Sequence, residues 1–440
     1  MQSVNYCCNT GLKMLSVGVT DTAALDVKLG KAQWNDESIM IPVIPRTQTR
    51  HFSGQTMSII KNIIAGGSRD SLEKFESEMA GYTGVSHAVG YSSGRSACRA
   101  LFECLGYAAG TSVLVPSLNY PAIPRTLELL GLRIIWVPLK VPGLEPDYDG
   151  IDAADAESAS AFILPHYYGI PSDVEKALRF CDKYGIDLIE DCAHAQGSFY
   201  RDKHVGCFGR AGFISFETSK PMNTLGGGML LTGDGDLAER LNISRPESRG
   251  IPIKGILKSY AEAAITSRWV YTVSLFPLLY GPRLKGVPDF LEEGLEGPAA
   301  REVQALSDLQ AELGLRHLSR FEWYLAGLRR QFDLIHGLLV KSGLAVRVAD
   351  GAQPNGYMTA GYHEDAGGIA AAFYKKGVDV KLRYMQDCQD LGIGAGGARC
   401  PRIAGGMFHL PLRTGISDRG IAGYASVVRD VLRDFSSEVF

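Results

Sequence analysis

A pair of carboxylates followed by a histidine stands directly after an apolar run, in Ile189-Glu-Asp-Cys-Ala-His-Ala-Gln-Gly197. If the run is a strand, Asp191 lies at its end, where a carboxylate can pair with a protonated heteroaromatic nitrogen and keep that ring able to accept electrons. An acidic helix cap is the competing interpretation, because such caps are common after strands. The segment by itself leaves both interpretations open.

A second segment, Phe213-Ile-Ser-Phe-Glu-Thr-Ser-Lys-Pro-Met-Asn-Thr-Leu-Gly-Gly-Gly228, places Lys220 just beyond an apolar run that delivers Ser215. The glycines that follow allow the backbone to approach a ligand closely. A lysine that loses its proton in such a pocket can attack an aldehyde. Considered alone, Lys220 could equally be a surface lysine, which is the usual situation for this residue type.

Two further groups of residues are suited to binding phosphate and flat rings. Gly94, Arg95 and Ser96 stand at the predicted start of a helix, where backbone N–H groups attract phosphate. Tyr120 follows another apolar run and could stack on a flat ring. An ordinary helix cap and a buried or turn tyrosine are the competing interpretations.

Short apolar strands alternate with helix-like segments over the first half of the chain. Strands are expected at 112–116, 133–137, 161–165, 187–190, 212–216 and 228–232, and helices at 58–64, 71–79, 125–130 and 172–183. This alternation is typical of a mostly parallel sheet covered by helices on both faces, in which ligands bind beyond the carboxyl ends of the strands. Polar residues fall at those ends: Asn119, Tyr120, His166, Asp191 and His194.

Changes in the residue pattern along the sequence suggest that the chain has three parts. We expect an N-terminal extension at 1–50, a large α/β domain at 51–290 with an apolar insertion at about 255–290, and a long helix with a small α+β domain at 291–440. Within the insertion, the apolar segment Trp269–Tyr280 is too short to span a membrane. We expect it to be a buried or interface segment, and contact with a membrane surface is the alternative.

Bulk properties exclude several classes of protein. The formal net charge of −3 gives no global attraction to nucleic acid or anionic membranes. The 9 cysteines form no CxxC pair, so we expect free thiols and no bound metal. The N-terminus lacks the pattern of a signal peptide, and together with the thiols this predicts a cytoplasmic protein.

The order of these segments resembles the DegT/DnrJ/EryC/StrS family of sugar aminotransferases, which are fold-type I enzymes that use pyridoxal 5′-phosphate (PLP). The segments that carry the resemblance are Ser92-Ser-Gly-Arg-Ser-Ala97, Pro116-Ser-Leu-Asn-Tyr120, Glu190-Asp-Cys-Ala-His194, Ser215-Phe-Glu-Thr-Ser-Lys220 and Gly226-Gly-Gly228. Shorter segments that also resemble the family are Pro165-His-Tyr-Tyr-Gly169, Glu247-Ser-Arg-Gly250, Ser307-Asp-Leu-Gln310 and Leu410-Pro-Leu412. The resemblance extends over roughly residues 55 to 435.

The resemblance implies a role for each matching residue. Lys220 would hold PLP as a Schiff base and move protons, while Asp191 would pair with the pyridine nitrogen. His194 would lie near the phenolic oxygen of PLP. The remaining residues would bind the ring face or the phosphate: Tyr120 for the face, and Gly94, Arg95, Ser96 and Ser215 for the phosphate.

The chain also departs from the family. Arg95 stands where the family has threonine, and it could supply charge to the phosphate. Val303-Gln-Ala-Leu306 replaces an Asn-x-Arg-Met motif whose asparagine reaches the phosphate of the partner subunit. We therefore expect a divergent member of the family.

The resemblance implies an aminotransferase that moves an amino group from an amino acid, with glutamate expected, to a keto-sugar or a related cyclic ketone. It also implies a homodimer with the active site at the interface. Elimination or dehydration on a sugar-like substrate is an alternative, although family members that dehydrate lack the lysine found here at Lys220. A PLP-fold binding protein without turnover is the other alternative.

Overall fold

The computed structural model describes residues 42–46, 48, 49, 51, 54–65, 70–248, 250, 253–284, 302–394, 397, 399–413 and 416–436. Most of the predicted extension 1–50 lies outside the described residues, and so does the end of the predicted insertion, residues 285–290. Among the helices that are described, none has the length and apolar character needed to cross a membrane.

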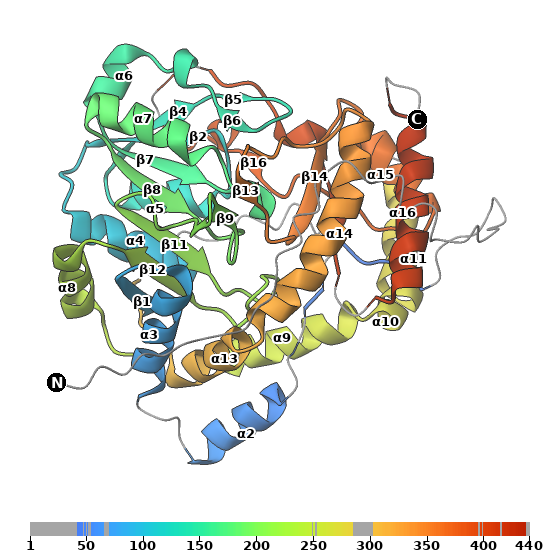
Figure 1. The fold of residues 1–440 in the computed structure, drawn as a ribbon, viewed down its shortest axis with the longest axis horizontal. Helices are drawn as coiled ribbons and strands as arrows, with labels where there is room; N and C mark the ends of the chain where they lie inside the picture. The colour runs from blue at the N-terminus through green and yellow to red at the C-terminus, as the bar shows by residue number, and fades with distance from the viewer. Residues whose placement is uncertain are drawn as a thin grey trace, which may run out of the picture. The chain divides into compact units, whose positions relative to one another are not determined.

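A seven-stranded sheet in the order β1-β12-β11-β8-β7-β2-β4 forms the centre of the larger part (Figure 1). Its strands are β1 (His87–Tyr91), β2 (Ser112–Pro116), β4 (Arg133–Val137), β7 (Ala159–Pro165), β8 (Asp187–Asp191), β11 (Ala211–Ser215) and β12 (Gly228–Thr232). Only β12 runs antiparallel to its neighbours in this sheet. The predicted mostly parallel α/β fold is confirmed.

Helices cover both faces of this sheet because its buried strands present apolar side chains alternately to the two sides. In β2, Val113 and Val115 pack with α4 and α5, whereas Leu114 joins the cluster on the opposite face. The helices of the larger part are α2 (Gln55–Ala65), α3 (Ser71–Thr83), α4 (Gly94–Leu105), α5 (Ala122–Leu129), α6 (Ala153–Ser158), α7 (Val174–Tyr184), α8 (Gly235–Ser244) and α13 (Asp308–Leu318).

A smaller sheet in the order β14-β17-β15 lies in the C-terminal part. Its elements are β14 (Met358–Tyr362), β15 (Lys381–Leu382) and β17 (Met407–Pro411), with the helices α14 (Phe321–Lys341), α15 (Ala366–Lys375) and α16 (Asp418–Arg433). The short strands β3 (Leu118–Asn119), β5 (Leu139–Lys140), β6 (Glu145–Pro146), β9 (Phe199–Tyr200), β10 (Lys203–His204), β13 (Ala352–Gln353) and β16 (Gln386–Asp387) form small ladders.

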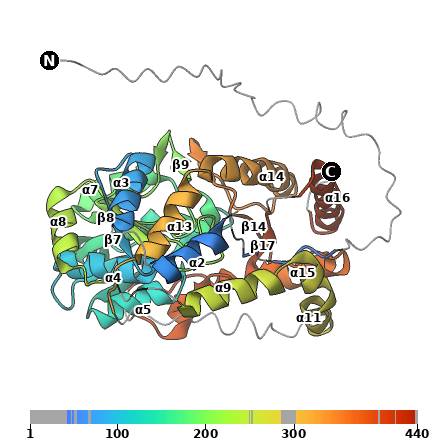
Figure 2. The ribbon, with the colours of Figure 1, turned by 90° about the horizontal axis from the view of Figure 1, so that it is seen from below.

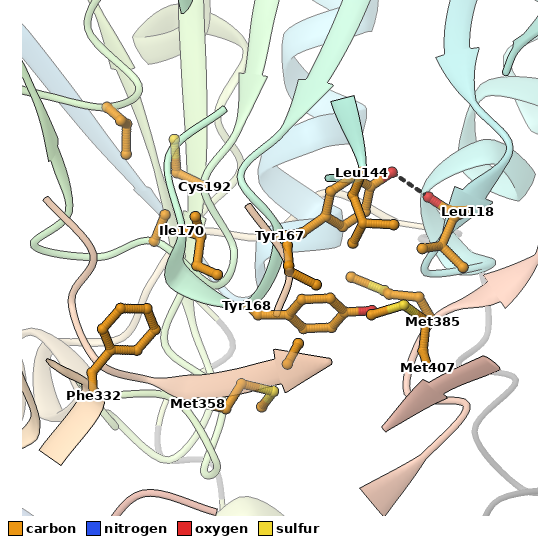
Figure 3. Packing of buried hydrophobic residues seen from close by; sticks show 14 of the residues in the cluster. Leu118, Leu144, Tyr167, Tyr168, Ile170, Cys192, Phe332, Met358, Met385 and Met407 are labelled. Carbon is orange, nitrogen blue, oxygen red and sulfur yellow. Dashed lines mark hydrogen bonds between the residues drawn. The ribbon is translucent and has the colours of Figure 1, made fainter. Parts of the chain in front are cut away.

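One apolar core is shared by the two sheets. Tyr168, which follows β7, packs with Met358, Met385 and Met407 from the C-terminal part (Figure 3). This continuous core holds the small sheet against the carboxyl ends of the large one. The proposed domain division at 290/291 stays a prediction.

The predicted insertion folds into three helices, α9 (Ile253–Ile265), α10 (Arg268–Val273) and α11 (Leu275–Leu284). Figure 1 shows α9 and α10 at its lower side, and in the view from below α9 lies close to α2 (Figure 2). The backbone N–H groups of Val43 and Thr49 donate to the hydroxyls of Thr272 and Thr266, at 2.9 and 3.3 Å. The insertion therefore packs against the stretch of chain that precedes the large domain.

Candidate functional site

The carboxyl ends of neighbouring parallel strands bring the first candidate residues together. Phe213 of β11 pairs with Asp191 at the end of β8, and the backbone N–H of Cys192 donates to the Phe213 carbonyl at 2.9 Å. Ser215 ends β11, and the loop that carries Lys220 begins directly after it. Asp191, Ser215 and Lys220 thus share one edge of the sheet, as the sequence predicts.

Asp191 is a buried carboxylate whose Oδ1 accepts a hydrogen bond from the backbone N–H of Ala193, at 2.9 Å. Burial raises the pKa of Asp191 to about 6, although the Ala193 hydrogen bond and the positive charge of Lys220 oppose this rise. A buried anion of this kind is stabilised by a cationic group placed beside it. The carboxylate is therefore well suited to pairing with a protonated ring nitrogen.

His194 is buried among aromatic rings and accepts a hydrogen bond at Nδ1 from the backbone N–H of Tyr168, at 3.3 Å. Burial, and then the positive charges of Lys220 and Lys381, lower its pKa well below the ordinary value for histidine. The ring is therefore neutral, and because Nδ1 is an acceptor its proton lies on Nε2. His194 can donate from Nε2 to an oxygen in the site.

Two tyrosines from the C-terminal part surround the end of Lys220. Lys220 Nζ donates to the Tyr384 hydroxyl at 3.2 Å, and the hydroxyls of Tyr384 and Tyr357 lie 3.2 Å apart. Nζ also lies 5.2 and 5.7 Å from the ring centroids of Tyr357 and Tyr384. Burial raises the pKa of Tyr384 to about 12, so its hydroxyl stays protonated at neutral pH and can donate to Tyr357.

Gln196 braces the lysine loop at both of its ends. Its side-chain amide donates to the Ser215 carbonyl before the loop, and its Oε1 accepts from the backbone N–H of Met222 after it, at 2.8 Å. Asn355 in turn donates through Nδ2 to the carbonyls of His194 and Gln196, each at 2.8 Å. The C-terminal part thus orients the segment that follows Asp191.

Glu190, the other carboxylate of the pair, has a structural role. Oε1 accepts from the Gly206 N–H at 2.7 Å and lies 3.2 Å from His166 Nε2, while Oε2 accepts from the backbone of Phe208 and Gly209. Burial alone would raise the pKa of Glu190, but these hydrogen bonds hold it below the ordinary value. Glu190, His166 and Cys192 lie close enough to share a metal ion, yet the carboxylate is already satisfied by these donors.

The phosphate-binding candidates lie at the start of α4. Ser93 caps this helix by accepting from the Ser96 N–H at 3.0 Å, so Gly94 begins the first turn. A side chain on Gly94 would approach the Ser215 Cβ to 3.0 Å, which shows that the two backbones are in close contact. Gly94 and Ser215 are therefore brought together at a helix N-terminus, where anions bind.

Ser96 is positioned differently from the other phosphate candidates. Its hydroxyl donates to the Glu302 carbonyl at 3.4 Å and accepts from the Gln304 N–H at 3.1 Å. This hydroxyl therefore attaches the segment that replaces the family's Asn-x-Arg-Met motif to α4. Arg95 is half-buried in the first turn of α4, and its proposed contact with the phosphate stays a prediction.

Tyr120 and α9 complete the surroundings of the lysine loop. Burial, and to a smaller extent the charge effect of Tyr120, raises the pKa of Tyr384. On the other side, Lys258 of α9 forms an ion pair with Glu217 at 3.0 Å, and the Thr218 hydroxyl donates to Glu262 at 2.6 Å. The inserted helix is thus attached to the loop that carries Lys220.

The residues of this site fit PLP. Asp191 offers a buried anion to the ring nitrogen, and Lys220 offers an amine to the aldehyde. The side-chain Nδ2 of Asn119, next to Tyr120, is buried and has no hydrogen-bond partner among the described residues, as expected of a group that faces a polar ligand. The close packing of Gly94 against Ser215 places the N-terminus of α4 beside the end of β11, where its backbone N–H groups can attract a phosphate.

Comparison with known proteins agrees with this geometry. The model of the DegT/DnrJ/EryC1/StrS aminotransferase family matches residues 59–265, which include Asp191, Ser215 and Lys220. Residues 59–265 are therefore similar to the members of this family. Its members depend on PLP, which confirms the predicted cofactor at the level of the family.

Two curated relatives illustrate the range of activities among similar chains. A UDP-N-acetyl-3-dehydro-alpha-D-glucosamine 3-aminotransferase from Acidithiobacillus ferrooxidans is 34% identical over 38% of this chain and 45% of its own length. An L-glutamine:scyllo-inosose aminotransferase from Streptomyces griseus is 28% identical over 64% of this chain and 70% of its own length. The chain thus spans about half the length of the first of these relatives.

Solved structures show the fold over almost the whole chain. The sugar aminotransferase Spr1654 from Streptococcus pneumoniae in its PLP form has a TM-score of 0.65 and 18% identity, covering 89% of this chain and 99% of its own. Helicobacter pylori PseC, an aminotransferase of pseudoaminic acid biosynthesis, has a TM-score of 0.67 and 18% identity, covering 89% and 100%. At these identities the likeness establishes the fold alone.

Several residues of the site were not found by sequence reasoning. Gln196 lies two residues after His194 in the segment that begins with Asp191. This position was the feature of the sequence that could have identified it. Tyr357, Tyr384 and Asn355 come from irregular parts of the C-terminal region. We see no local pattern in the sequence that would have identified them.

Proposed function

We propose that this chain is a PLP-dependent aminotransferase that acts on a keto-sugar or a related cyclic ketone. The observation that carries the proposal is the meeting of Lys220 and Asp191 at one edge of the sheet. Lys220 Nζ lies within a tyrosine pair, and Asp191 is a buried anion whose pKa responds to the charge of Lys220. A reactive amine and a buried carboxylate at one site are what amino-group transfer with PLP requires.

When bound, PLP supplies an electron sink for the negative charge that develops on the carbon that loses its proton. The Asp191 carboxylate would keep the ring able to accept electrons, because it stabilises a proton on the ring nitrogen. A surface carboxylate would do this less well, since water would screen its charge. The burial of Asp191 therefore serves the chemistry.

Lys220 moves the protons of the reaction. With PLP bound, Nζ would hold the cofactor, and as a free amine it would accept the proton from the donor's α-carbon. The same amine would return a proton to the carbon of the acceptor that receives the amino group. Tyr384 holds Nζ by a hydrogen bond between these steps.

His194 and Gln196 orient the reacting groups. The neutral His194 ring donates from Nε2, so it is suited to an anionic oxygen on the cofactor ring. Gln196 holds the two ends of the lysine loop at a constant separation. We assign the phosphate to the N-terminus of α4 with Gly94, Arg95 and Ser215, with Tyr120 on the ring face.

The substrate class rests on the relatives. Their names give keto derivatives of sugar nucleotides and inososes as acceptors, and L-glutamine as the donor for the inosose enzymes. We expected glutamate from the sequence, and both amino acids are candidates for this chain. As in the sequence-based expectation, we propose a homodimer with its active site at the interface.

A half-reaction experiment tests the proposal. The purified chain loaded with PLP is expected to be yellow, and borohydride should leave a pyridoxyl group on the peptide that contains Lys220. Glutamine or glutamate should convert the visible band to that of the amine form. Mass spectrometry should then detect an aminated product from a panel of 3-keto nucleotide sugars and inososes.

Two results would contradict this function. Absence of a borohydride adduct on Lys220 would exclude covalent PLP binding. A stable adduct whose band is unchanged by glutamine, glutamate and a panel of other amino acids would indicate a binding protein without turnover.

A further inference from the structure

A small cavity lies beside the backbone of Lys220. Its volume is about 50 Å³, and it is lined by Ser219 and Pro221, the two neighbours of Lys220 in the chain. Tyr357 is another of its wall residues, and the centroid of this ring lies 5.2 Å from Lys220 Nζ. The cavity therefore adjoins the space around the reactive amine.

Two arginines line this cavity, and none of the described residues that line it is acidic. Arg46 forms an ion pair with the buried Asp379 at 3.0 Å, which offsets its charge. Arg413 is 3% exposed, and its Nε donates to Gln48 Oε1 at 3.0 Å while its Nη2 lies 3.5 Å from the Thr266 carbonyl oxygen. Both of these acceptors are neutral, so they leave the positive charge of the guanidinium in place.

Arg413 is held by segments that lie far apart in the chain. Its backbone N–H donates to the Gln331 side chain on α14 at 3.1 Å, and Gln331 donates back to the Arg413 carbonyl. Gln48 belongs to the stretch that precedes the large domain, and Thr266 directly follows α9. Because both the backbone and the side chain are fixed, the planar donor group keeps one orientation, as recognition of an oxyanion requires.

The walls of the cavity favour a small anionic group as its ligand. A guanidinium presents a planar fork of N–H donors that matches a carboxylate or a phosphate. The volume of about 50 Å³ holds a few water molecules, which is room for a carboxylate but not for a nucleotide. A carboxylate on a small substrate is therefore the ligand that fits both the charge and the size.

The amino donor carries such a group to this place. L-glutamine, the donor named for the inosose aminotransferase, has one anionic group, its α-carboxylate. The α-carboxylate is attached to the same carbon as the amino nitrogen that must reach the end of Lys220. An anchor for it must therefore lie beside the lysine, whereas an inosose acceptor has no anionic group to place there.

We propose that Arg413 binds the α-carboxylate of the amino donor in this cavity. The charged hydrogen bonds hold the donor while its amino group faces the end of Lys220. The stretch before the large domain and the insertion contribute to donor binding, because Gln48 and Thr266 position the arginine. This inference rests on the proposed aminotransferase function and adds to it the residue that recognises the donor.

The donor half-reaction of the PLP-loaded chain tests the proposal. Arg413→Gln should raise the concentration of glutamine or glutamate that half-saturates conversion of the visible band about 30-fold or more, because an ion pair with hydrogen bonds is lost. The KM of the acceptor should be unchanged. Arg413→Lys should retain part of the affinity, since it keeps the charge without the planar fork.

Arg245→Gln is the matched control for these variants. Arg245 is a partly buried arginine that pairs with Glu76 and does not line the cavity. Its loss should leave the response to the donor unchanged.

A comparison of amino acids with their α-methyl esters separates recognition from structural damage. The native chain should prefer the acid to its ester about 30-fold or more, and Arg413→Gln should lose this preference, because the ester offers no anion to the guanidinium. A merely structural role would lower the rates with acid and ester alike. Calorimetric titration with 2-oxoglutarate, which has an α-carboxylate but no amino group, should show a similar loss of affinity in the variant.

Two results would overturn the proposal. The first is an Arg413→Gln variant that still prefers the acid to the ester as strongly as the native chain does. The second is a raised KM for the acceptor with an unchanged response to the donor, which would assign the cavity to the acceptor.

Failure of the proposed function has a different outcome. The native chain would then carry the Lys220 adduct, but neither glutamine nor glutamate would change its visible band. In that event the titration with 2-oxoglutarate still decides the role of Arg413. Binding that the variant loses supports a carboxylate site, whereas absent binding or equal binding in the two chains overturns it.

Discussion

The two ends of the candidate cofactor site are built in different ways. The ring end, formed by Asp191, His194 and Lys220, is held by hydrogen bonds from Gln196 and Asn355 to the backbone and from Lys220 to Tyr384. At the phosphate end, formed by Gly94, Arg95, Ser96 and Ser215, the Ser96 hydroxyl bonds to the protein backbone at Glu302 and Gln304. We propose that this chain keeps the reactive groups of the family and differs from it at the anchor for the cofactor.

The difference has a physical origin. The ring end must place an amine and a charge within fractions of an ångström, so it uses strand ends and buried amides that cannot shift independently. Phosphate binding relies on a helix N-terminus and charge, which tolerate exchange of individual side chains. We expect substitutions at the ring end to have larger effects than substitutions at the phosphate end.

The largest effect is expected for Lys220→Ala. Removal of the amine that attaches PLP and moves protons should lower kcat at least about 10⁴-fold, and borohydride should leave no adduct. Lys258→Gln is the control, because it removes a nearby lysine and should retain the adduct on Lys220. An adduct that persists in the Lys220 variant would show that another amine holds the cofactor.

Asp191→Asn should lower kcat at least about 100-fold while it stabilises the cofactor-free protein. Burial raises the pKa of Asp191 from 3.8 to about 6, so the free energy of unfolding falls as pH rises from about 4 to about 6, by about 3 kcal/mol in total. The variant should recover this free energy at pH 7.5 and show no gain at pH 4. Urea denaturation of the native chain and the variant at the two pH values measures the difference in the free energy of unfolding. The same difference at both pH values would show that Asp191 is not charged at pH 7.5.

Tyr384→Phe should have an intermediate effect. Loss of the hydroxyl that accepts from Lys220 Nζ should lower kcat about tenfold, the usual scale for one hydrogen bond to a charged group, and should change the pH profile of kcat. Tyr362→Phe on β14 is the matched control and should behave as the native chain does. Identical pH profiles for the two variants would remove Tyr384 from the mechanism.

Ser96→Ala should have the smallest effect of these substitutions on the binding of PLP. The hydroxyl bonds to the backbone of Glu302 and Gln304, so its loss should lower the free energy of unfolding by about 1 kcal/mol. Ser215→Ala should weaken PLP binding by about tenfold, as expected for a ligand contact. Titration of the two cofactor-free variants with PLP measures the affinity of each for the cofactor. An equal loss of affinity in the two variants would show that the phosphate end uses Ser96 as well.

Much of the fold followed from local patterns. The expected strands at 112–116 and 133–137 coincide with β2 and β4, because a buried parallel strand must be apolar throughout. The long helix expected in the part 291–440 is divided into α13 and α14, and α13 begins at Asp308 because Ser307 caps it and the preceding residues pair with Tyr91 and Ser92. The apolar segment at 269–280 was expected to be a buried or interface segment. Tyr271 and Leu279 are buried, whereas Trp269, Val273 and Leu278 are exposed.

The sequence alone determined the kind of chemistry. Asp191 and Lys220 each lie within a few residues of the end of an apolar strand. A relation of this kind can be recognised from residues that are neighbours in the sequence. Only the tertiary structure decided what surrounds Lys220. Tyr357 and Tyr384 lie more than a hundred residues away along the chain and reach Nζ because the small sheet packs on the carboxyl ends of the large one. Contacts between distant segments depend on packing of the whole core, which no local pattern records.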